Sequence, residues 1–247
     1  MFRVARGGAE SLFQGCWMGL LPESVCDEIS ELSYGDGAAY SNGAYLDSGF
    51  HFWEELAIGR YFAPAGSVLV AAAGSGREMI ALARAGFEAD GFDCSRPMVQ
   101  AGREALAARN IAGVLEWAPP CQIPPIRHPY DALIVGWNGY CYISPRFRRI
   151  AFLKNLKANL GPGAPVLVSG AFRTKRSQSA VWTPRVGNFV RRVTFRPPAF
   201  EAGDLFPGRP RHHFTRGQLE REMTDAGFLP AEFFVWGEFC ALVCHNA

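Results

Sequence analysis

Features typical of membrane and secreted proteins are missing from this sequence. No apolar run approaches the roughly 20 residues that a membrane-spanning helix requires. The first residues, MFRVARGGAESLFQGC, lack the uninterrupted apolar core of a signal peptide. We therefore expect a cytoplasmic protein that has no membrane as a partner.

The cysteines form no Cys-x-x-Cys pair, and their number is odd. They stand at positions 16, 26, 94, 121, 141, 240 and 244. A scattered set of this kind predicts reduced thiols that pack in the core or line a site, and no metal site. Internal repeats and low-complexity tracts are also lacking, so nothing indicates a repeat architecture.

The composition favours one compact α/β domain, because 247 residues with 49% apolar content can bury a large core. Charge is distributed unevenly along the chain. Residues 171–216 contain ten Lys or Arg residues against Glu201 and Asp204, a net charge of +8. Such a segment either solvates an irregular loop or binds an acidic partner, and both interpretations remain open.

The most informative pattern is VLVAAAGSGREM, residues 68–79, followed by GFDCS, which contains Asp93. An apolar strand leads into a turn of small residues and then into a helix, and the next strand ends on an acid. Small residues allow a ligand to approach the backbone, and a helix N-terminus favours an anionic group. The acid can accept hydrogen bonds from both ribose hydroxyls. This pattern predicts a nucleotide-type cofactor site.

Strands and helices alternate between residues 67 and 170, which predicts a parallel sheet with helices on both faces. We expect strands over 68–72, 87–92, 113–117, 131–135 and 165–169, and helices over 78–85, 97–108 and 145–160. The end of the chain differs. Thr215 and Gln218 can form a capping box for a helix over 216–225, and two adjacent apolar runs, AEFFVW and FCALVC, predict an antiparallel hairpin.

These motifs together resemble the class I S-adenosylmethionine-dependent methyltransferases. VLVAAAGSGRE is similar to the family's glycine-rich first motif, GFDCSRPMV to its second, and YDALIVGWNGY to its fourth-strand motif. The resemblance covers roughly residues 62–170 and 212–247. It implies a doubly wound, mostly parallel seven-stranded sheet with a C-terminal antiparallel strand. It also implies an N-terminal helical lid over residues 1–60 and a domain over 61–247 with a substrate-side insertion at 171–211.

Three positions depart from the family pattern. Val70 stands where the family has an acid in the first strand, and Ala72 replaces the first glycine of the turn. Ala72 is tolerable if its φ is negative. Trp117 stands where an acid commonly contacts the adenine amino group, and it either stacks on the base or packs in the core. A protein that has kept the cofactor site but lost catalysis is therefore one alternative.

A nicotinamide dehydrogenase uses a similar turn and acid. Met79 argues against it, because this side chain fills the space that lets the helix lie close to a pyrophosphate. No Tyr-x-x-x-Lys pair is present either. We therefore expect S-adenosylmethionine as the cofactor and S-adenosylhomocysteine as its product.

The resemblance implies a set of site residues. Those expected to bind the cofactor are Tyr45, Ala72, Gly74, Ser75, Gly76, Arg77, Asp93, Cys94, Met98, Trp117, Gly136 and Trp137. The candidates for catalysis are His51, Asn138, Tyr140 and His213. Histidine is a general base near neutral pH, and Asn138 can orient the acceptor. A structural role is the alternative for each of these four.

We expect a small-molecule or peptide acceptor, as in tailoring enzymes, held between the N-terminal lid and the basic insertion. The arginines of the insertion predict that the acceptor can be anionic. A nucleic-acid methyltransferase is the alternative, but the chain contains neither a separate RNA-binding module nor the family's Asn-Pro-Pro-Tyr motif.

Overall fold

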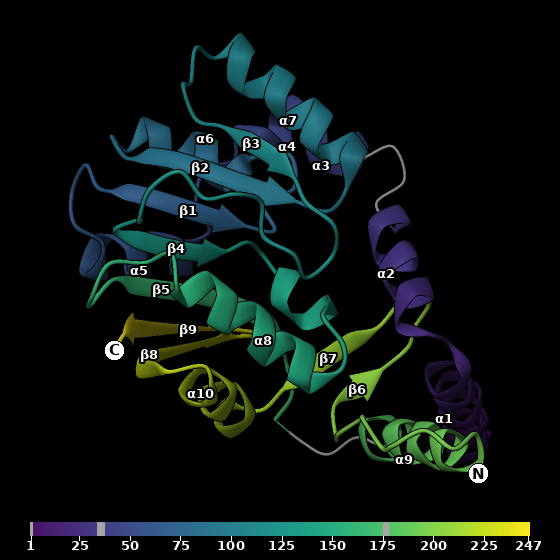
Figure 1. Cartoon of the computed structure of the whole chain (residues 1–247). Coiled ribbons are helices and arrows are strands. Elements are labelled where there is room, and N and C mark those ends of the chain that lie inside the picture. The colour runs from purple at the N-terminus through teal and green to yellow at the C-terminus, as the bar shows by residue number, and fades with distance from the viewer. Residues whose placement is uncertain (1, 34–37, 175–177) are drawn as a thin grey trace.

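The computed structural model describes residues 2–33, 38–174 and 178–247, without the side chains of residues 2–7. Its centre is a parallel sheet in the order β3-β2-β1-β4-β5 (Figure 1). The strands are β1 (Ser67–Ala71), β2 (Glu88–Asp93), β3 (Leu115–Trp117), β4 (Ala132–Val135) and β5 (Pro165–Phe172). β1, β4 and β5 are buried on both faces, which explains their continuous apolar sequences.

Helices cover both faces of the sheet, as predicted. α5 (Phe52–Tyr61), α6 (Arg77–Arg84) and α7 (Arg96–Ala108) pack on one face, where Trp53, Ile80 and Leu106 share a core. α8 (Arg146–Lys157) and α10 (Arg216–Asp225) pack on the other face, with Leu153 and Leu219 in its core. A short 3₁₀ helix, η1 (Gly139–Tyr142), follows β4.

The C-terminal hairpin is confirmed. β8 (Phe228–Trp236) and β9 (Phe239–Asn246) pair antiparallel, and β9 runs antiparallel to β5 from Pro165 to Ala171. This places one antiparallel strand next to the parallel set. The capping box of α10 is also present, since the Thr215 side chain accepts a hydrogen bond from the Gln218 backbone N–H.

The number of strands differs from the prediction: among the described residues the sheet has nine strands, where the resemblance implied seven. The extra strands, β6 (Asp204–Leu205) and β7 (Arg211–Phe214), come from the insertion. β5 extends beyond the end of β4, and β7 pairs in parallel with its last residues, Ala171 and Phe172. Unpaired backbone groups on the longer strand explain why the insertion joins the sheet.

The first two N-terminal helices and the insertion lie together beyond the carboxyl ends of the strands, whereas the next two N-terminal helices lie beside α6 and α7 (Figure 1). The N-terminal helices are α1 (Phe2–Leu20), α2 (Glu23–Leu32), α3 (Ala38–Ser41) and α4 (Gly43–Leu46). The insertion forms α9 (Gln178–Val193), which packs along α1. The sequence RRVTFRPPAF, residues 191–200, suggests a strand edge that Pro197 and Pro198 break, but the structure has no strand there. The first residues of this segment complete α9, and Pro197 and Pro198 cannot donate the hydrogen bonds of a strand.

Candidate functional site

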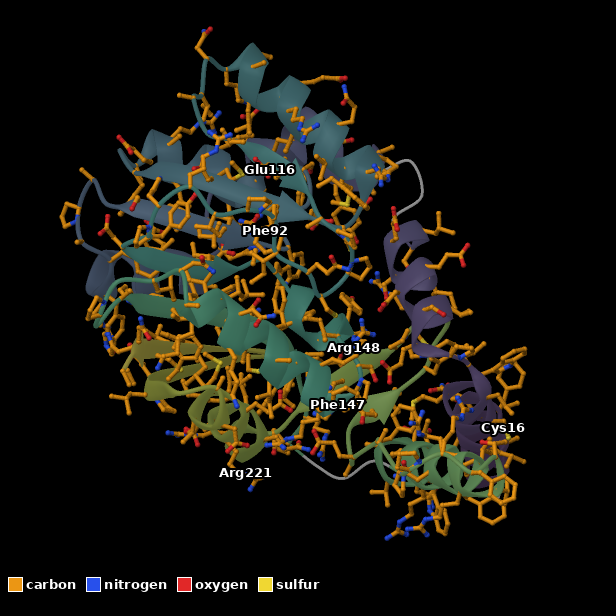
Figure 2. The ribbon with its side chains drawn as sticks, in the orientation of Figure 1. Cys16, Phe92, Glu116, Phe147, Arg148 and Arg221 are labelled. Atoms are coloured by element: carbon orange, nitrogen blue, oxygen red, sulfur yellow. The ribbon has the colours of Figure 1, made fainter. Side chains whose placement is uncertain are left out.

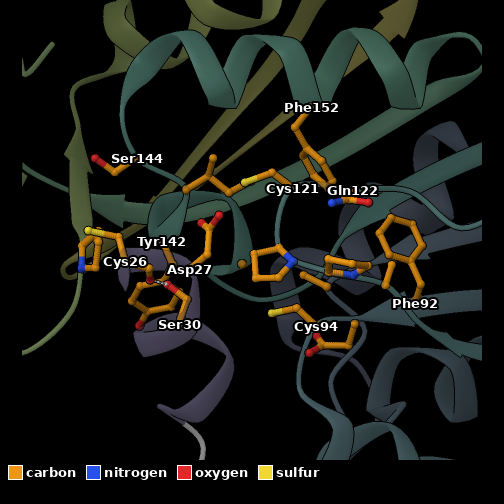
Figure 3. A pocket seen from close by; sticks show the side chains of 18 of the residues that line it. Cys26, Asp27, Ser30, Phe92, Cys94, Cys121, Gln122, Tyr142, Ser144 and Phe152 are labelled. Atoms are coloured by element: carbon orange, nitrogen blue, oxygen red, sulfur yellow. Dashed lines mark hydrogen bonds between the residues drawn. The ribbon is translucent and has the colours of Figure 1, made fainter. Parts of the chain in front are cut away.

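A cavity opens at the carboxyl-terminal edge of the sheet, where β1, β2 and β4 end beside one another (Figure 3). It encloses about 780 Å³, counting the part open to solvent. The lining side chains come from the strand ends, α2, the stretch after β4 and the insertion, and include Ala72, Asp93, Cys94, Ala118, Gln122, Phe152, Cys26, Asp27, Ser30, Tyr142, Ser144, Arg209 and Pro210.

The glycine turn forms one side of this edge. Gly74 and Gly76 have φ values of 55° and 85°, in the left-handed region that favours glycine. A Cβ atom on Gly74 would lie 2.7 Å from the Cε atom of Met98, so this side chain packs beneath the turn. Ser75 is buried, and its hydroxyl donates to the Tyr40 carbonyl of the N-terminal segment. The turn is therefore held from both sides.

Ala72 does not have the negative φ that would make it an easy replacement for glycine. Its φ is 54°, a conformation that costs an L-residue about 1–2 kcal/mol. The segment after β4 leaves room for the Ala72 methyl group because Gly139 has no side chain. A Cβ atom on Gly139 would lie 2.4 Å from the Ala72 Cβ. Gly136 is restricted in the same way, since a Cβ would approach the Ala72 carbonyl oxygen to 2.3 Å.

Asp93 joins the turn to the end of β2. Its two carboxylate oxygens accept hydrogen bonds of 2.8 Å from the backbone N–H groups of Gly74 and Ser95. Burial raises the pKa of this carboxyl, although the backbone donors oppose the shift. Each oxygen keeps a second lone pair. The carboxylate is therefore fixed in orientation and can accept further hydrogen bonds from a ligand in the cavity.

Trp117 does not line the cavity. Its indole N–H donates to the Cys94 carbonyl at 2.9 Å, and the Arg96 guanidinium lies 3.4 Å from its ring centroid. The Trp117 ring therefore stacks against the Arg96 side chain. Cys94 does line the cavity, and burial and the neighbouring Asp93 raise the pKa of its thiol.

Arg77 lies behind the glycine turn and not in the cavity. Its guanidinium contacts the carboxylates of Glu54 at 2.7 Å and Glu78 at 2.8 Å, and all three side chains are buried. Burial disfavours the cation, but these two carboxylates outweigh it and raise the pKa of Arg77. The residue therefore links α5 to α6. Tyr45 packs nearby, with its ring centroid 5.9 Å from the guanidinium carbon.

A group of unpaired polar atoms adjoins this ion cluster. His51 and Trp137 pack with ring centroids 4.7 Å apart, and Asn138 follows directly in the chain. Among the described side chains, the buried atoms without a hydrogen-bond partner include His51 Nε2, Trp137 Nε1 and Asn138 Oδ1. Burial and the nearby Arg77 cation lower the pKa of His51, so its ring is neutral near pH 7. Buried polar atoms without a partner call for an explanation, and none of these three residues belongs to the lining of the cavity.

Tyr140 and His213 are not brought to this site. The Tyr140 hydroxyl donates to the Glu222 carboxylate at 2.6 Å, and its ring stacks on Phe214, so the side chain is fully buried in the core. His213 lies on β7, outside the cavity lining. Burial and then the Arg211 cation lower the pKa of His213 to about 4. The sequence could not show that η1 turns Tyr140 inward.

The far end of the cavity was missed by sequence reasoning. α2 contributes Cys26, Asp27 and Ser30 to the lining, and the bidentate ion pair of Asp27 with Arg148, at 2.8 Å for each contact, fastens α2 to α8. The Arg209 guanidinium lies 3.6 Å from the Tyr142 ring centroid. No local pattern signals these residues, because they come from three segments distant in sequence.

The arginines of the insertion divide into two groups. Arg191 donates to the Pro197 carbonyl, and Arg196 donates to the carbonyls of Gly19 and Leu20 at the end of α1. Their role is therefore structural. Arg209 lines the cavity, and Arg192 is exposed on α9. The charge of the insertion is spread over several surfaces.

No family model and no curated protein sequence matches this chain. The structure is similar to a solved S-adenosylmethionine-dependent methyltransferase from Methanosarcina mazei, with a TM-score of 0.62 and 16% identity over 80% of this chain and 98% of that one. It is similar to the CcbJ methyltransferase of Streptomyces caelestis, with a TM-score of 0.58 and 16% identity over 77% and 87%.

A third similar structure is the magnesium protoporphyrin IX methyltransferase of Synechocystis, solved with bound S-adenosylhomocysteine, with a TM-score of 0.60 and 15% identity over 92% and 100%. None of the helices in residues 2–33, 38–174 and 178–247 is long and apolar enough to cross a membrane. The chain therefore has the Rossmann-like fold of the class I S-adenosylmethionine-dependent methyltransferases, as its motifs predicted.

Proposed function

We propose that this chain transfers a methyl group from S-adenosylmethionine to a small-molecule or peptide acceptor. The observation that carries the proposal is the cavity at the carboxyl ends of the strands, which extends from Asp93 to Arg209 within a methyltransferase fold. When bound, S-adenosylmethionine supplies an electrophilic methyl group. The protein then has to orient the acceptor, exclude water and accept a proton.

The strand ends fit the nucleoside part of the cofactor. Asp93 presents an oriented carboxylate for the ribose hydroxyls, and the turn at Gly74 lets the backbone approach closely. Cys94 and Ala118 provide an apolar wall for the base. These are the contacts that the sequence motif predicts for the family.

The methionine part needs a different explanation, because the usual acid is replaced by Val70. We assign the negative charge to Glu78, whose carboxylate accepts from the Trp137 backbone N–H at 3.3 Å and contacts Arg77. With Glu54, this cluster has two carboxylates for one guanidinium. A cationic ammonium group would complete its charge balance.

His51 and Asn138 remain the proposed pair for proton transfer and orientation. His51 has an unpaired ring nitrogen and a lowered pKa, so it is in the neutral form that accepts a proton. Asn138 has an unpaired carbonyl oxygen, which can hold a donor group of the acceptor. A general base must be unprotonated before it accepts a proton, and His51 is neutral at pH 7.

For the acceptor, we propose a planar compound with a carboxylate or phosphate group. The stacked pair of Arg209 and Tyr142 offers a flat surface with positive charge, and Ser30 and Ser144 offer hydroxyl groups beside it. Natural-product tailoring is one setting for such an acceptor, and one similar structure concerns echinomycin biosynthesis.

The test is a thermal-shift screen of anionic and neutral planar compounds with S-adenosylhomocysteine present, followed by mass spectrometry of turnover with S-adenosylmethionine. We expect anionic compounds to stabilise the protein and to gain 14 mass units per methyl group, about the mass of a CH₂ unit. Stabilisation by neutral apolar compounds alone would contradict the anionic acceptor. Cofactor binding without turnover of any stabilising compound would indicate a protein that has lost catalysis.

A further inference from the structure

The helices α1 and α9 pack closely against each other, away from the sheet. A Cβ atom on Gly15 would lie 2.5 Å from the Val186 Cβ, and one on Gly19 would lie 2.6 Å from the Val190 Cβ. These contacts rise in residue number on both helices, so the helices run parallel. The two glycines let the backbones approach, and the pair lies at one end of the molecule (Figure 1).

The outer side of this pair has an unusual composition. Along residues 12–20 of α1 and 180–193 of α9, every exposed residue is either apolar or an arginine. On α1 these residues are Leu12, Phe13, Trp17 and Leu20. On α9 they are Trp182, Arg185, Phe189, Arg192 and Val193. We call this set the α1–α9 face.

Helix geometry places the exposed residues of both helices on the side away from the domain. Successive residues turn by about 100° around a helix. On α1, the Gln14 side chain accepts a hydrogen bond from the Phe206 backbone N–H, and Leu12 lies about 160° away around the helix. On α9, Pro184 is buried, and Trp182 lies about 160° away. Because the helices are parallel neighbours, the α1–α9 face is one continuous surface.

The apolar area of this surface exceeds what monomers usually expose. Its seven apolar side chains are between 44% and 65% exposed. With about 200 Å² for a large side chain, they present roughly 700 Å², whereas the largest apolar patch of a typical monomer is about 300–600 Å². Phe195, two residues after α9, has a φ of 57° and is 99% exposed, so no described part of the chain covers its ring. The surface therefore calls for an occupant from outside the chain.

The charges of the pair favour an anionic occupant. Residues 172–200 contain seven Lys or Arg residues and no acid. Arg185 and Arg192 lie about 100–160° around α9 from the valines that face α1, so they border the apolar band on its far side. The acid of α1 is Glu10, whose carboxylate accepts a hydrogen bond of 3.0 Å from the buried Gln14. A second copy of the face would bring the same arginines and no acid to pair with them.

The face also has few groups for a protein partner. Protein interfaces contain about one hydrogen bond per 100–200 Å², and among the exposed side chains of this face only the two arginines can form one. Trp, Phe and Leu beside arginine are typical of helices that lie in the surface of a membrane. The Arg185 guanidinium carbon lies 5.2 Å from the Trp182 ring centroid, so cation and apolar ring share one patch.

We propose that the α1–α9 face binds the surface of an anionic lipid bilayer, with its apolar side chains among the acyl chains and its arginines at the lipid phosphates. The sequence led us to expect no membrane as a partner, because no segment is long enough to span one. A helix pair that lies in the membrane surface has no such length requirement. The proposal does not rest on the enzymatic function.

Cosedimentation of the full chain with lipid vesicles tests the charge of the occupant. We expect binding to phosphatidylcholine vesicles that contain phosphatidylserine, weaker binding to phosphatidylcholine alone, and a loss of binding as salt is added. One arginine near an anionic surface strengthens binding about 5-fold, so Arg192→Gln should weaken it by about that factor. Arg221→Gln is the matched control, because Arg221 is exposed on α10, outside the face (Figure 2).

A second pair of variants tests the apolar part of the face. Phe189→Ser should weaken binding to the phosphatidylserine vesicles by about 5-fold or more, because less apolar surface leaves water. Phe147→Ser should not, since Phe147 is 57% exposed on α8, outside the face (Figure 2). Both side chains are exposed, so both variants should melt at the wild-type temperature. Equal losses of binding in these two variants would contradict the assignment to the face.

Tryptophan quenching by lipids with brominated acyl chains tests the depth of insertion. We expect quenching in the wild type, and its loss without loss of binding when Trp17 and Trp182 are both replaced by Phe. No binding to phosphatidylserine vesicles, equal binding to neutral vesicles, or binding without quenching would each overturn the proposal. A dimer by light scattering that Phe189→Ser dissociates would overturn it as well, because the second copy would then cover the face.

Discussion

Asp93→Asn changes one atom of the side chain that joins the glycine turn to the end of β2. In the native protein both carboxylate oxygens accept backbone hydrogen bonds of 2.8 Å, from Gly74 and Ser95, and both face the cavity edge. Asparagine replaces one acceptor by a donor and removes the charge. Hydrogen bonds to charged groups contribute about 1.5–3 kcal/mol, so we expect S-adenosylhomocysteine to bind about 10–150-fold more weakly.

The same change should have a smaller effect on folding. Burial raises the pKa of Asp93, which means that ionisation above its unfolded pKa of 3.8 opposes folding. The loss of one backbone hydrogen bond costs about 0.5–1.5 kcal/mol, and removing the buried charge offsets part of it. We therefore expect a variant that remains folded at neutral pH and binds its ligand poorly.

Titration calorimetry with S-adenosylhomocysteine and 5′-methylthioadenosine measures the effect, and both ligands should lose affinity because both contain the ribose. Asp90→Asn is the matched control. Asp90 is also on β2 and accepts from Val114 at 2.7 Å and Tyr130 at 2.8 Å, but it does not line the cavity. Unchanged affinity in folded Asp93→Asn, or equal losses in the two variants, would show that the Asp93 carboxylate does not bind the ribose.

Glu78→Gln should weaken S-adenosylhomocysteine by about 10-fold or more in calorimetry and leave 5′-methylthioadenosine unchanged, since only the former has an ammonium group; equal losses would contradict the assignment. Ala72→Gly should raise the free energy of unfolding in urea by up to about 1 kcal/mol, because φ is 54° there, and a decrease would show that the methyl contact matters more. Because the pKa of His213 falls from 6.5 to about 4 on folding, the unfolded chain binds the proton more readily between these values. Stability should therefore fall from pH 6.5 to pH 4 more steeply in the wild type than in His213→Asn, and parallel melting curves would argue against it.

Much of the fold was predictable because its signals are local. Thr215 and Gln218 set the start of α10 at Arg216, and the two runs joined by Gly237 and Glu238 could only pair antiparallel. Predicted and observed strand ends differ by a few residues at most, except that β5 continues to Phe172.

The parts that were not predicted depend on contacts between distant segments. The pairing of β7 with the end of β5 depends on where β4 stops, and the position of α2 depends on the ion pair of Asp27 with Arg148. An alanine at position 72 does not by itself predict a left-handed backbone conformation. It is accommodated by Gly139, 67 positions further along the chain.

In the candidate site, too, local patterns were predictable and contacts between distant segments were not. Gly74, Gly76 and Asp93 lie where the motif predicted, because strand, turn and helix are consecutive. Tyr140 was expected in the site because it follows β4, but its hydroxyl is used by Glu222 in the core. Whether a residue after a strand points to a ligand or to the core is decided by packing, which one sequence does not show.

We propose that the cavity next to Asp93 binds S-adenosylmethionine and its product. Calorimetric titration of the wild-type protein with S-adenosylhomocysteine and, separately, with NADH tests it most directly. We expect saturable binding of S-adenosylhomocysteine, which Asp93→Asn weakens, and no heat from NADH, because Met79 packs fully buried where a pyrophosphate would need space. Heat from NADH with none from S-adenosylhomocysteine would show that the cavity binds a dinucleotide and not S-adenosylmethionine.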